Sequence, residues 1–402
     1  MKFAHLADCH IGSWRDDKLK DISTKVFSKA IEQCIERKVD FVLIAGDLFN
    51  TSLPSIDLLK EVVTKLKSLS ENNIPVYIIP GSHDFSPSGK TMLDVLENAG
   101  LLTNVVKGEI VEGKLKLNFT IDKKTGAKIT GLLGKKGMLD KIYYENLMHE
   151  NLEQEPGYKI FMFHTALSEF KPNDMEHMEA QPLSLLPKNF NYYAGGHVHY
   201  IFQKQEPDYG MITYPGALFP ANFAELEKYG NGGFYIIDND KVEWIPVSVY
   251  NTFSLDLDCQ HKTPQQVHEM ILSKIGTKEF NNTIVTLRVY GKLESGRISD
   301  IDFNGIFQTL YEKSAYFVMK NTSGITTTEF EEIKVNVDNV ESIENELIDQ
   351  HIGKIKIPDM DTIKEKGLIN SLLKTLSMEK AEEERVLDFE SKLKQELSGV
   401  IW

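Results

Sequence analysis

The sequence predicts an α/β protein in three parts: a layered N-terminal domain, a small α+β domain and a charged helical C-terminal segment. Residues 1 to about 110 alternate apolar strand-like runs with helical apolar spacing, a pattern typical of right-handed crossovers in a layered sandwich. Residues 252–320 predict strand, helix, strand, helix and strand in turn. After about Val337 the chain is highly charged and is predicted to be helical. The expected domains are residues 1–250, 251–337 and 338–402.

The elements of the first domain follow from periodicity. Three apolar runs predict buried strands, and helical spacing follows each of them. Strands are expected at residues 2–7, 41–45 and 76–79, and helices at 24–38, 55–71 and about 90–99. Two later apolar runs, at residues 160–163 and 192–194, lead into histidines.

Short strands with glycine turns and many lysines are expected between Val105 and Gly137. Lysines of this kind usually lie on solvated strand edges. A surface that faces phosphate is the alternative interpretation. The lysines are Lys107, Lys114, Lys116, Lys123, Lys124, Lys128, Lys135 and Lys136.

Composition restricts the class of protein. The 402 residues contain no apolar run long enough for a membrane span, and the N-terminus turns polar too early for a secretory signal. Cys9, Cys34 and Cys259 have no metal-binding spacing and are expected to be reduced thiols. The net charge of −14 argues against a protein that coats duplex DNA, although bound divalent cations can attract phosphate locally.

Five polar clusters follow the ends of apolar runs. Residues two apart on an extended segment face the same way, so Asp8 with His10, and His197 with His199, can each present two ligands to one place. Carboxylate with imidazole suits Mn, Fe or Zn better than Mg or Ca alone. The clusters are Asp8-x-His10, Gly46-Asp47, Gly81-Ser82-His83-Asp84, His164 and Gly196-His197-x-His199. No role is assigned to His5 or His149.

The order of these clusters resembles that of the calcineurin-like metallophosphoesterases, whose fold is a two-sheet αββα sandwich around a dinuclear metal centre. The match covers about residues 1–200. Three details resemble the SbcD/MRE-type nuclease subunit of archaeal and bacterial double-strand-break repair. They are the opening Phe3-Ala4-His5-Leu6-Ala7-Asp8-Cys9-His10-Ile11-Gly12, the run Ala45-Gly46-Asp47-Leu48-Phe49, and Tyr214-Pro215-Gly216.

This resemblance implies the roles of the site residues. One metal would be held by Asp8, His10 and His199, and the second by His164 and His197 with Ser82, while Asp47 would bridge them. His83 would contact the scissile phosphate and assist the leaving oxygen, and Asp84 would orient its imidazole. Two positions depart from the family pattern: Ser82 replaces the usual Asn, and Asn50 stands where some relatives carry a histidine near DNA.

The resemblance further implies an Mn²⁺-dependent DNA exonuclease and endonuclease with two divalent ions. Its partners would be single- or double-stranded DNA ends, an ABC-type coiled-coil ATPase bound by the C-terminal helices, and a second copy of the chain. The small domain would be a capping domain, and the protein would be cytoplasmic and nucleoid-associated. Two alternatives stay open: a phosphodiesterase or phosphatase for small or protein substrates, and a catalytically weak DNA-end or ATPase scaffold.

Overall fold

The computed structural model describes residues 1–86, 91–172, 175, 177–239, 241–327, 348, 361–378 and 386–401. The chain divides into two compact units. The first comprises Met1–Leu257, Met270–Val289 and Asp302–Asn321, and the second Asp258–Glu269, Tyr290–Ile301 and Thr322–Trp402. The expected domain boundaries at residues 250 and 337 stay predictions.

Two six-stranded sheets form the centre of the first unit. In spatial order, the first sheet contains β14 (Lys241–Val247), β13 (Gly232–Asp238), β1 (Lys2–Leu6), β2 (Phe41–Ala45), β3 (Val76–Ile79) and β4 (Thr103–Asn104). The second contains β11 (Phe202–Gln205), β12 (Met211–Tyr214), β10 (Tyr192–Gly196), β9 (Lys159–His164), β8 (Lys128–Gly131) and β7 (Thr120–Ile121). Strands β1 to β4 are parallel, and so are β8, β9, β10 and β12. The strands predicted at residues 41–45 and 76–79 are confirmed.

The two sheets pack face to face. Phe3, Leu43 and Ile79 of the first sheet share one buried cluster with Ile160 and Tyr192 of the second. These residues belong to the faces that meet, because successive side chains of a strand point to opposite sides.

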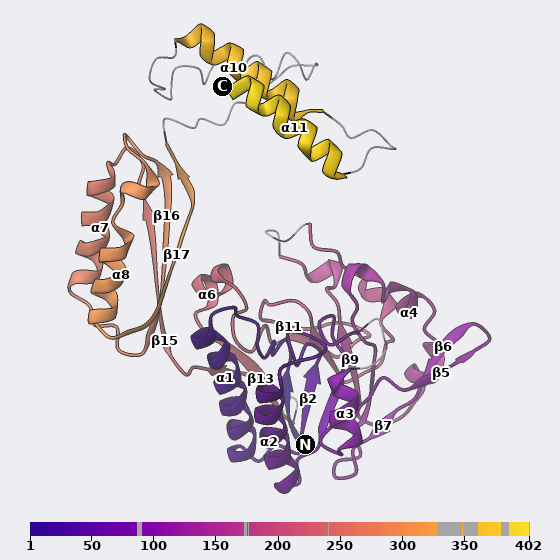
Figure 1. The fold of residues 1–402 in the computed structure, drawn as a ribbon. Coiled ribbons are helices and arrows are strands. Elements are labelled where there is room, and N and C mark those ends of the chain that lie inside the picture. Colours follow the sequence, from indigo (N-terminus) through magenta and orange to yellow (C-terminus); the bar gives the residue numbers. More distant parts are fainter. Residues whose placement is uncertain are drawn as a thin grey trace. The chain divides into compact units, whose positions relative to one another are not determined.

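Helices cover the outer faces of both sheets. The first sheet packs against α1 (Asp17–Glu36), α2 (Ile56–Glu71) and α3 (Met92–Asn98), and Figure 1 shows α1 and α2 side by side. On the second sheet, Tyr144 of α4 (Lys141–Glu145) and Leu152 of α5 (Glu150–Glu153) join the outer cluster. The predicted αββα sandwich is therefore confirmed.

Local chemistry explains where the helices begin. The α2 helix starts directly after Ser55, as expected. The α1 helix starts seven residues before the predicted residue 24, because the carboxylate of Asp16 caps it by accepting a hydrogen bond from the Lys18 backbone N–H at 2.9 Å. Thr91 and Asp94 form a capping box at the start of α3.

Shorter elements complete the first 230 residues. The lysine-rich stretch forms the expected short strands, including the hairpin of β5 (Gly108–Val111) and β6 (Lys114–Leu117). Helix α6 (Phe223–Tyr229) precedes β13. Single 3-10 turns lie at Lys136–Met138, Ser168–Phe170 and Leu183–Leu185, and a further one lies later in the chain at Ile298–Asp300.

The βαβαβ prediction for the following residues is confirmed. The strands β15 (Asn251–Asp258), β16 (Thr283–Lys292) and β17 (Ala315–Thr326) form a sheet in that order, and α7 (Pro264–Gly276) and α8 (Phe303–Glu312) connect them. Of the C-terminal segment, the structure describes α10 (Thr362–Leu376) and α11 (Val386–Ile401), which are helical as predicted. The predicted helical character of residues 338–360 lies outside the described residues, apart from Ile348. None of the described helices combines the length and the apolarity needed to cross a bilayer.

Candidate metal centre

The site residues lie at the carboxyl ends of five strands. Asp8 and His10 follow β1, Asp47 follows β2, and His164 is the last residue of β9. Ser82, His83 and Asp84 follow β3, and His197 and His199 follow β10. Parallel strands of two facing sheets thus deliver all five clusters to one edge of the sandwich, where α/β proteins commonly bind ligands.

The backbone at this edge is strained. Four residues of the site have φ angles in the left-handed region, which residues with a Cβ rarely adopt. The angles are 48° for Asp8, 41° for His10, 51° for Asp47 and 85° for His197. Such conformations cost free energy and tend to gather at functional sites. Hydrogen bonds hold the strained turns in place: the backbone N–H of His10 donates to the Asp47 carbonyl at 2.9 Å, and that of His197 donates to both Asp8 carboxylate oxygens at 2.9 and 3.0 Å.

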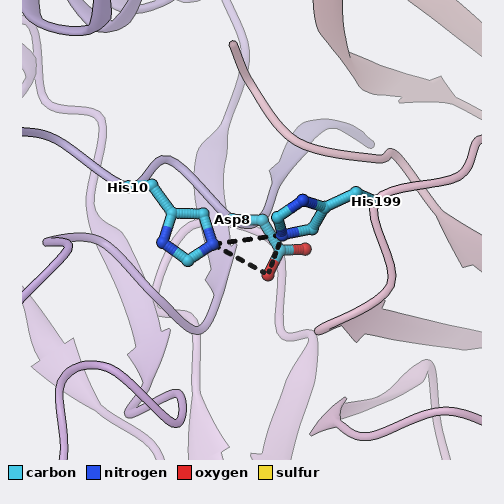
Figure 2. Close-up of side chains that lie close together, drawn as sticks. All are labelled: Asp8, His10 and His199. Atoms are coloured by element: carbon cyan, nitrogen blue, oxygen red, sulfur yellow. Dashed lines mark hydrogen bonds and ion pairs between the residues drawn. The ribbon is translucent and has the colours of Figure 1, made fainter. Parts of the chain in front are cut away.

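Asp8, His10 and His199 form the first group of potential ligands (Figure 2). The Nε2 atoms of the two histidines lie 3.1 Å apart, and each lies 4.0 Å from Asp8 Oδ1. Figure 2 shows the three side chains converging on one point from the loop after β1 and the loop after β10. An oxygen and two imidazole nitrogens this close together match the donor set of a borderline divalent cation.

Asp47 connects this group to a second one. Its Oδ2 atom lies 3.7 Å from His10 Nε2 on one side and 3.2 Å from His164 Nε2 on the other. The hydroxyl of Ser82 donates a long hydrogen bond of 3.5 Å to the same oxygen. His197 lies beside His164, with their ring centroids 5.3 Å apart. Asp47 is therefore the carboxylate that both groups can share.

The histidine tautomers show that these atoms fit a cation. The Nδ1–H of His164 donates to the Ala45 carbonyl oxygen at 2.8 Å. Since a carbonyl oxygen only accepts, Nδ1 carries a proton, and the buried Nε2 faces Asp47 Oδ2 at 3.2 Å, so that either a second proton or a cation has to lie between these two atoms. A shared cation would satisfy both atoms, because each has a lone pair to offer.

The electrostatics favour positive charge at the same place. Burial works to lower the pKa of His164, but Asp47 and Asp8 outweigh it and raise that pKa to about 10. Burial raises the pKa of Asp8 to about 7 and lowers the pKa of His10 to about 3 and that of His197 to about 4. A divalent cation would offset the cost of burying these carboxylates, while neutral imidazoles are the form that binds metal.

Glu225 was not among the predicted site residues. It lies on α6, and its carboxylate accepts a hydrogen bond of 2.8 Å from His199 Nδ1, which leaves His199 Nε2 to face Asp8 and His10. Burial acts to raise the pKa of Glu225, but the hydrogen bond and the charge of His199 outweigh burial and lower that pKa. The pattern Asn222-x-x-Glu225 signals a helix start, and Asn222 indeed caps α6. Nothing in that pattern indicates the contact with His199.

The structure corrects the expected role of Asp84. Instead of orienting His83, its buried carboxylate accepts hydrogen bonds from the backbone N–H groups of Leu48, Phe49 and Gly81 at 3.1–3.2 Å. Asp84 therefore fixes the turn after β2 to the turn after β3. Three converging amides satisfy a carboxylate better than one imidazole does.

His83 is oriented by a different group. Its Nδ1–H donates to the backbone carbonyl of Asn50 at 2.8 Å, and its own N–H donates to Asp47 Oδ1 at 2.7 Å. The half-buried ring packs edge-on to His10, with centroids 4.8 Å apart. Position 50 thus acts through its backbone, and a histidine there is not needed for this contact.

Comparison with known proteins agrees with this geometry. The family model described as calcineurin-like phosphoesterase matches residues 1–200. The "DNA double-strand break repair protein Mre11" of Archaeoglobus fulgidus is 24% identical over 430 residues, which cover 98% of this chain and 90% of that protein. The protein of the same name from Methanocaldococcus jannaschii is 29% identical, and the alignment covers 85% of this chain and 87% of that protein. The one from Methanococcus maripaludis is 28% identical, and the alignment covers 93% of this chain and 95% of that protein. Residues 1–200 of this chain therefore belong to the calcineurin-like metallophosphoesterase family and make it a metal-dependent phosphodiesterase.

Proposed function

We propose that the protein is an Mn²⁺-dependent DNA nuclease, with exonuclease and endonuclease activity, that processes the ends of double-strand breaks during repair. The observation that carries this proposal is the pair of ligand groups joined by Asp47, at the edge where both sheets end. The choice of DNA as substrate is supported by the similar proteins named for double-strand-break repair, which this chain matches along most of its length.

Two divalent ions are proposed for this site. Asp8, His10 and His199 would hold one ion, and His164, His197 and Ser82 would hold the other, with Asp47 contacting both. Bound ions would supply a hydroxide nucleophile at neutral pH and stabilise charge on the phosphate. The mixture of carboxylate and imidazole favours Mn²⁺ over Mg²⁺.

The protein's own contribution to the chemistry is assigned to His83. Because its Nδ1 is engaged by the Asn50 carbonyl, its Nε2 is the atom that can reach substrate. From this position it would contact the scissile phosphate and stabilise or protonate the leaving oxygen. Asp84 acts indirectly, by holding the turn that carries His83.

Two protein partners are proposed. The ABC-type coiled-coil ATPase would dock on the C-terminal helices, since Ile363, Leu373 and Leu376 of α10 are 83%, 41% and 59% exposed. A second copy of the chain would pack near the start of α2, where Leu53 and Ile56 are 70% and 83% exposed. Large apolar side chains clustered on a surface favour such interfaces. The protein would act in the cytoplasm at the nucleoid.

The function is tested with end-labelled duplex and single-stranded DNA in the presence of Mn²⁺, with and without the ATPase. We expect the wild type to cleave DNA, and His83→Ala to lose at least a hundredfold in rate while it still binds Mn²⁺ by calorimetry. The control His149→Gln changes a histidine outside the site and should cleave normally. Cleavage of small phosphate esters alone would point to a phosphatase, and no cleavage under any condition would point to a scaffold.

A further inference from the structure

Lys135 is held in an unusual way at the rim of the metal centre. Its ammonium lies 4.8 Å from the ring centroid of Phe85 and 4.8 Å from that of Tyr143, and it donates a hydrogen bond of 2.8 Å to the Tyr143 hydroxyl. Lys135 and Tyr143 are half-buried, and Phe85 is 36% exposed. Two aromatic faces and one neutral hydroxyl thus fix a flexible side chain in place.

This cluster of Phe85, Lys135 and Tyr143 adjoins the catalytic residues. Phe85 is two residues beyond His83. The N–H of Gly134 donates to the carbonyl of Pro80 at 3.0 Å, which ties the Lys135 segment to the turn that carries Ser82 and His83. A Cβ atom on Gly134 would lie only 2.5 Å from Cδ2 of His164, so this segment packs directly on a predicted metal ligand.

Among the residues that the structure describes, no acidic side chain forms an ion pair with the ammonium of Lys135. Asp140 attracts the charge of Lys135 from beyond ion-pair distance, and its carboxylate accepts a hydrogen bond from the Lys135 backbone N–H. Two other lysines that lie over aromatic rings do have acidic partners: Lys188 pairs with Asp208 at 3.1 Å, and Lys25 pairs with Asp21 at 2.6 Å.

A cation without an ion-pair partner, beside a phosphodiesterase centre, is suited to bind a second phosphate. The chain carries a net charge of −14, so a polyanionic substrate depends on local positive charge to approach. A lysine ammonium is a compact point charge that binds phosphate without strict geometry. We propose that Lys135 binds the phosphate next to the scissile one in a nucleic acid strand, with Phe85 and Tyr143 holding its ammonium in position.

This proposal rests on the proposed nuclease function and is tested with Lys135→Met, which keeps the length and apolar stem of the side chain. Lys135→Arg retains the charge and serves as the rescue. The matched control is Lys188→Met, a lysine that also lies over a ring but is already paired with Asp208. Retained Mn²⁺ binding and an unchanged melting temperature verify that each variant is folded.

The first measurement is binding of a short single-stranded oligonucleotide over a series of salt concentrations. We expect Lys135→Met to bind about tenfold more weakly and to lower the slope of log K against log salt by about 0.7, as the loss of one phosphate contact requires. This measurement does not need cleavage, so it decides the inference even if the wild type proves not to be a nuclease.

The second measurement compares substrates. Lys135→Met should lose about tenfold in kcat/KM on the oligonucleotide and nothing on bis-p-nitrophenyl phosphate, which has no neighbouring phosphate. A methylphosphonate beside the scissile bond should slow the wild type to the level of the variant and leave the variant unchanged. Equal losses on both substrates, or a salt slope identical to that of the wild type, would overturn the inference.

Discussion

At the scale of single residues, the metal centre is defined by the partners of its imidazole rings. Ala45 holds Nδ1 of His164, Asn50 holds Nδ1 of His83, and Glu225 holds Nδ1 of His199. In each case the ring is locked and its Nε2 atom is left for metal or substrate. Two of the three partners are backbone carbonyls, so the side chains of Ala45 and Asn50 give no indication in the sequence that these residues orient a histidine ring.

Glu225 is the exception, because its contribution comes from a side chain that can be changed. Glu225→Gln removes the negative charge behind His199, and Glu225→Ala removes the hydrogen bond as well. Losing such a partner typically lowers metal affinity about 10- to 100-fold. We expect Mn²⁺ titration calorimetry to show that Glu225→Gln loses about 10-fold in Mn²⁺ affinity and that Glu225→Ala loses about 100-fold.

The control for this prediction lies on the same helix. Glu227 faces Arg288, with 2.6 Å between its Oε2 and the guanidinium Nη2, and makes no contact with the ligands. Glu227→Gln should therefore leave Mn²⁺ affinity unchanged. Equal affinity in Glu225→Ala and the wild type would show that His199 does not need its carboxylate partner.

At the scale of elements, the site depends on how closely β2, β9 and β10 approach one another. A Cβ atom on Gly196, the last residue of β10, would lie 2.0 Å from the Ala45 carbonyl oxygen and 2.8 Å from His164 Nδ1. That carbonyl and that nitrogen form the hydrogen bond that orients His164. The glycine is therefore required by the ligand geometry as well as by packing.

Gly196→Ala should for this reason lower both stability and metal binding. Overpacking of this kind costs about 1–3 kcal/mol of unfolding free energy. Urea unfolding and Mn²⁺ calorimetry measure the two effects. Gly276→Ala is the control, because a Cβ there would meet nothing within 4 Å, and it should leave both quantities near their wild-type values. A Gly196→Ala protein with unchanged Mn²⁺ affinity would contradict this account.

The elements and the residues that gather at the candidate site could largely be predicted from the sequence, while contacts between loops could not. Apolar strands that end in Asp or His predicted Asp8, Asp47, His164 and His199 as candidate ligands, since periodicity and residue type are local properties, and the structure brings these side chains together. The role of Asp84 was wrong because its real partners are three backbone amides contributed by two different turns. Glu225 was missed because it meets His199 only after α6 folds against the end of β10.

At the scale of the whole molecule, the two sheets are joined by a polar contact inside an apolar core. His5 of β1 in the first sheet is fully buried, and its Nδ1 lies 3.0 Å from the Tyr192 hydroxyl and 3.1 Å from the Thr213 hydroxyl of the second sheet. Burial lowers the pKa of His5 from 6.5 to about 3. The folded sandwich thus keeps this imidazole neutral in a range of pH where the unfolded chain protonates it.

The sign of the resulting pH dependence follows from linkage. Since the pKa of His5 is lower in the folded state than in the unfolded chain, its contribution to stability is complete above pH 6.5 and is lost as pH falls toward 3. Between pH 7 and pH 5 the loss from this group amounts to about 2 kcal/mol of unfolding free energy.

His5→Gln replaces the imidazole with a group that does not titrate. In urea unfolding with a chelator present, which removes any contribution of bound metal, we expect the variant to lose about 2 kcal/mol less than the wild type over this interval. Equal losses in the two proteins would mean that the sandwich accommodates a protonated His5, with Nδ1–H donating to the hydroxyl oxygens of the second sheet.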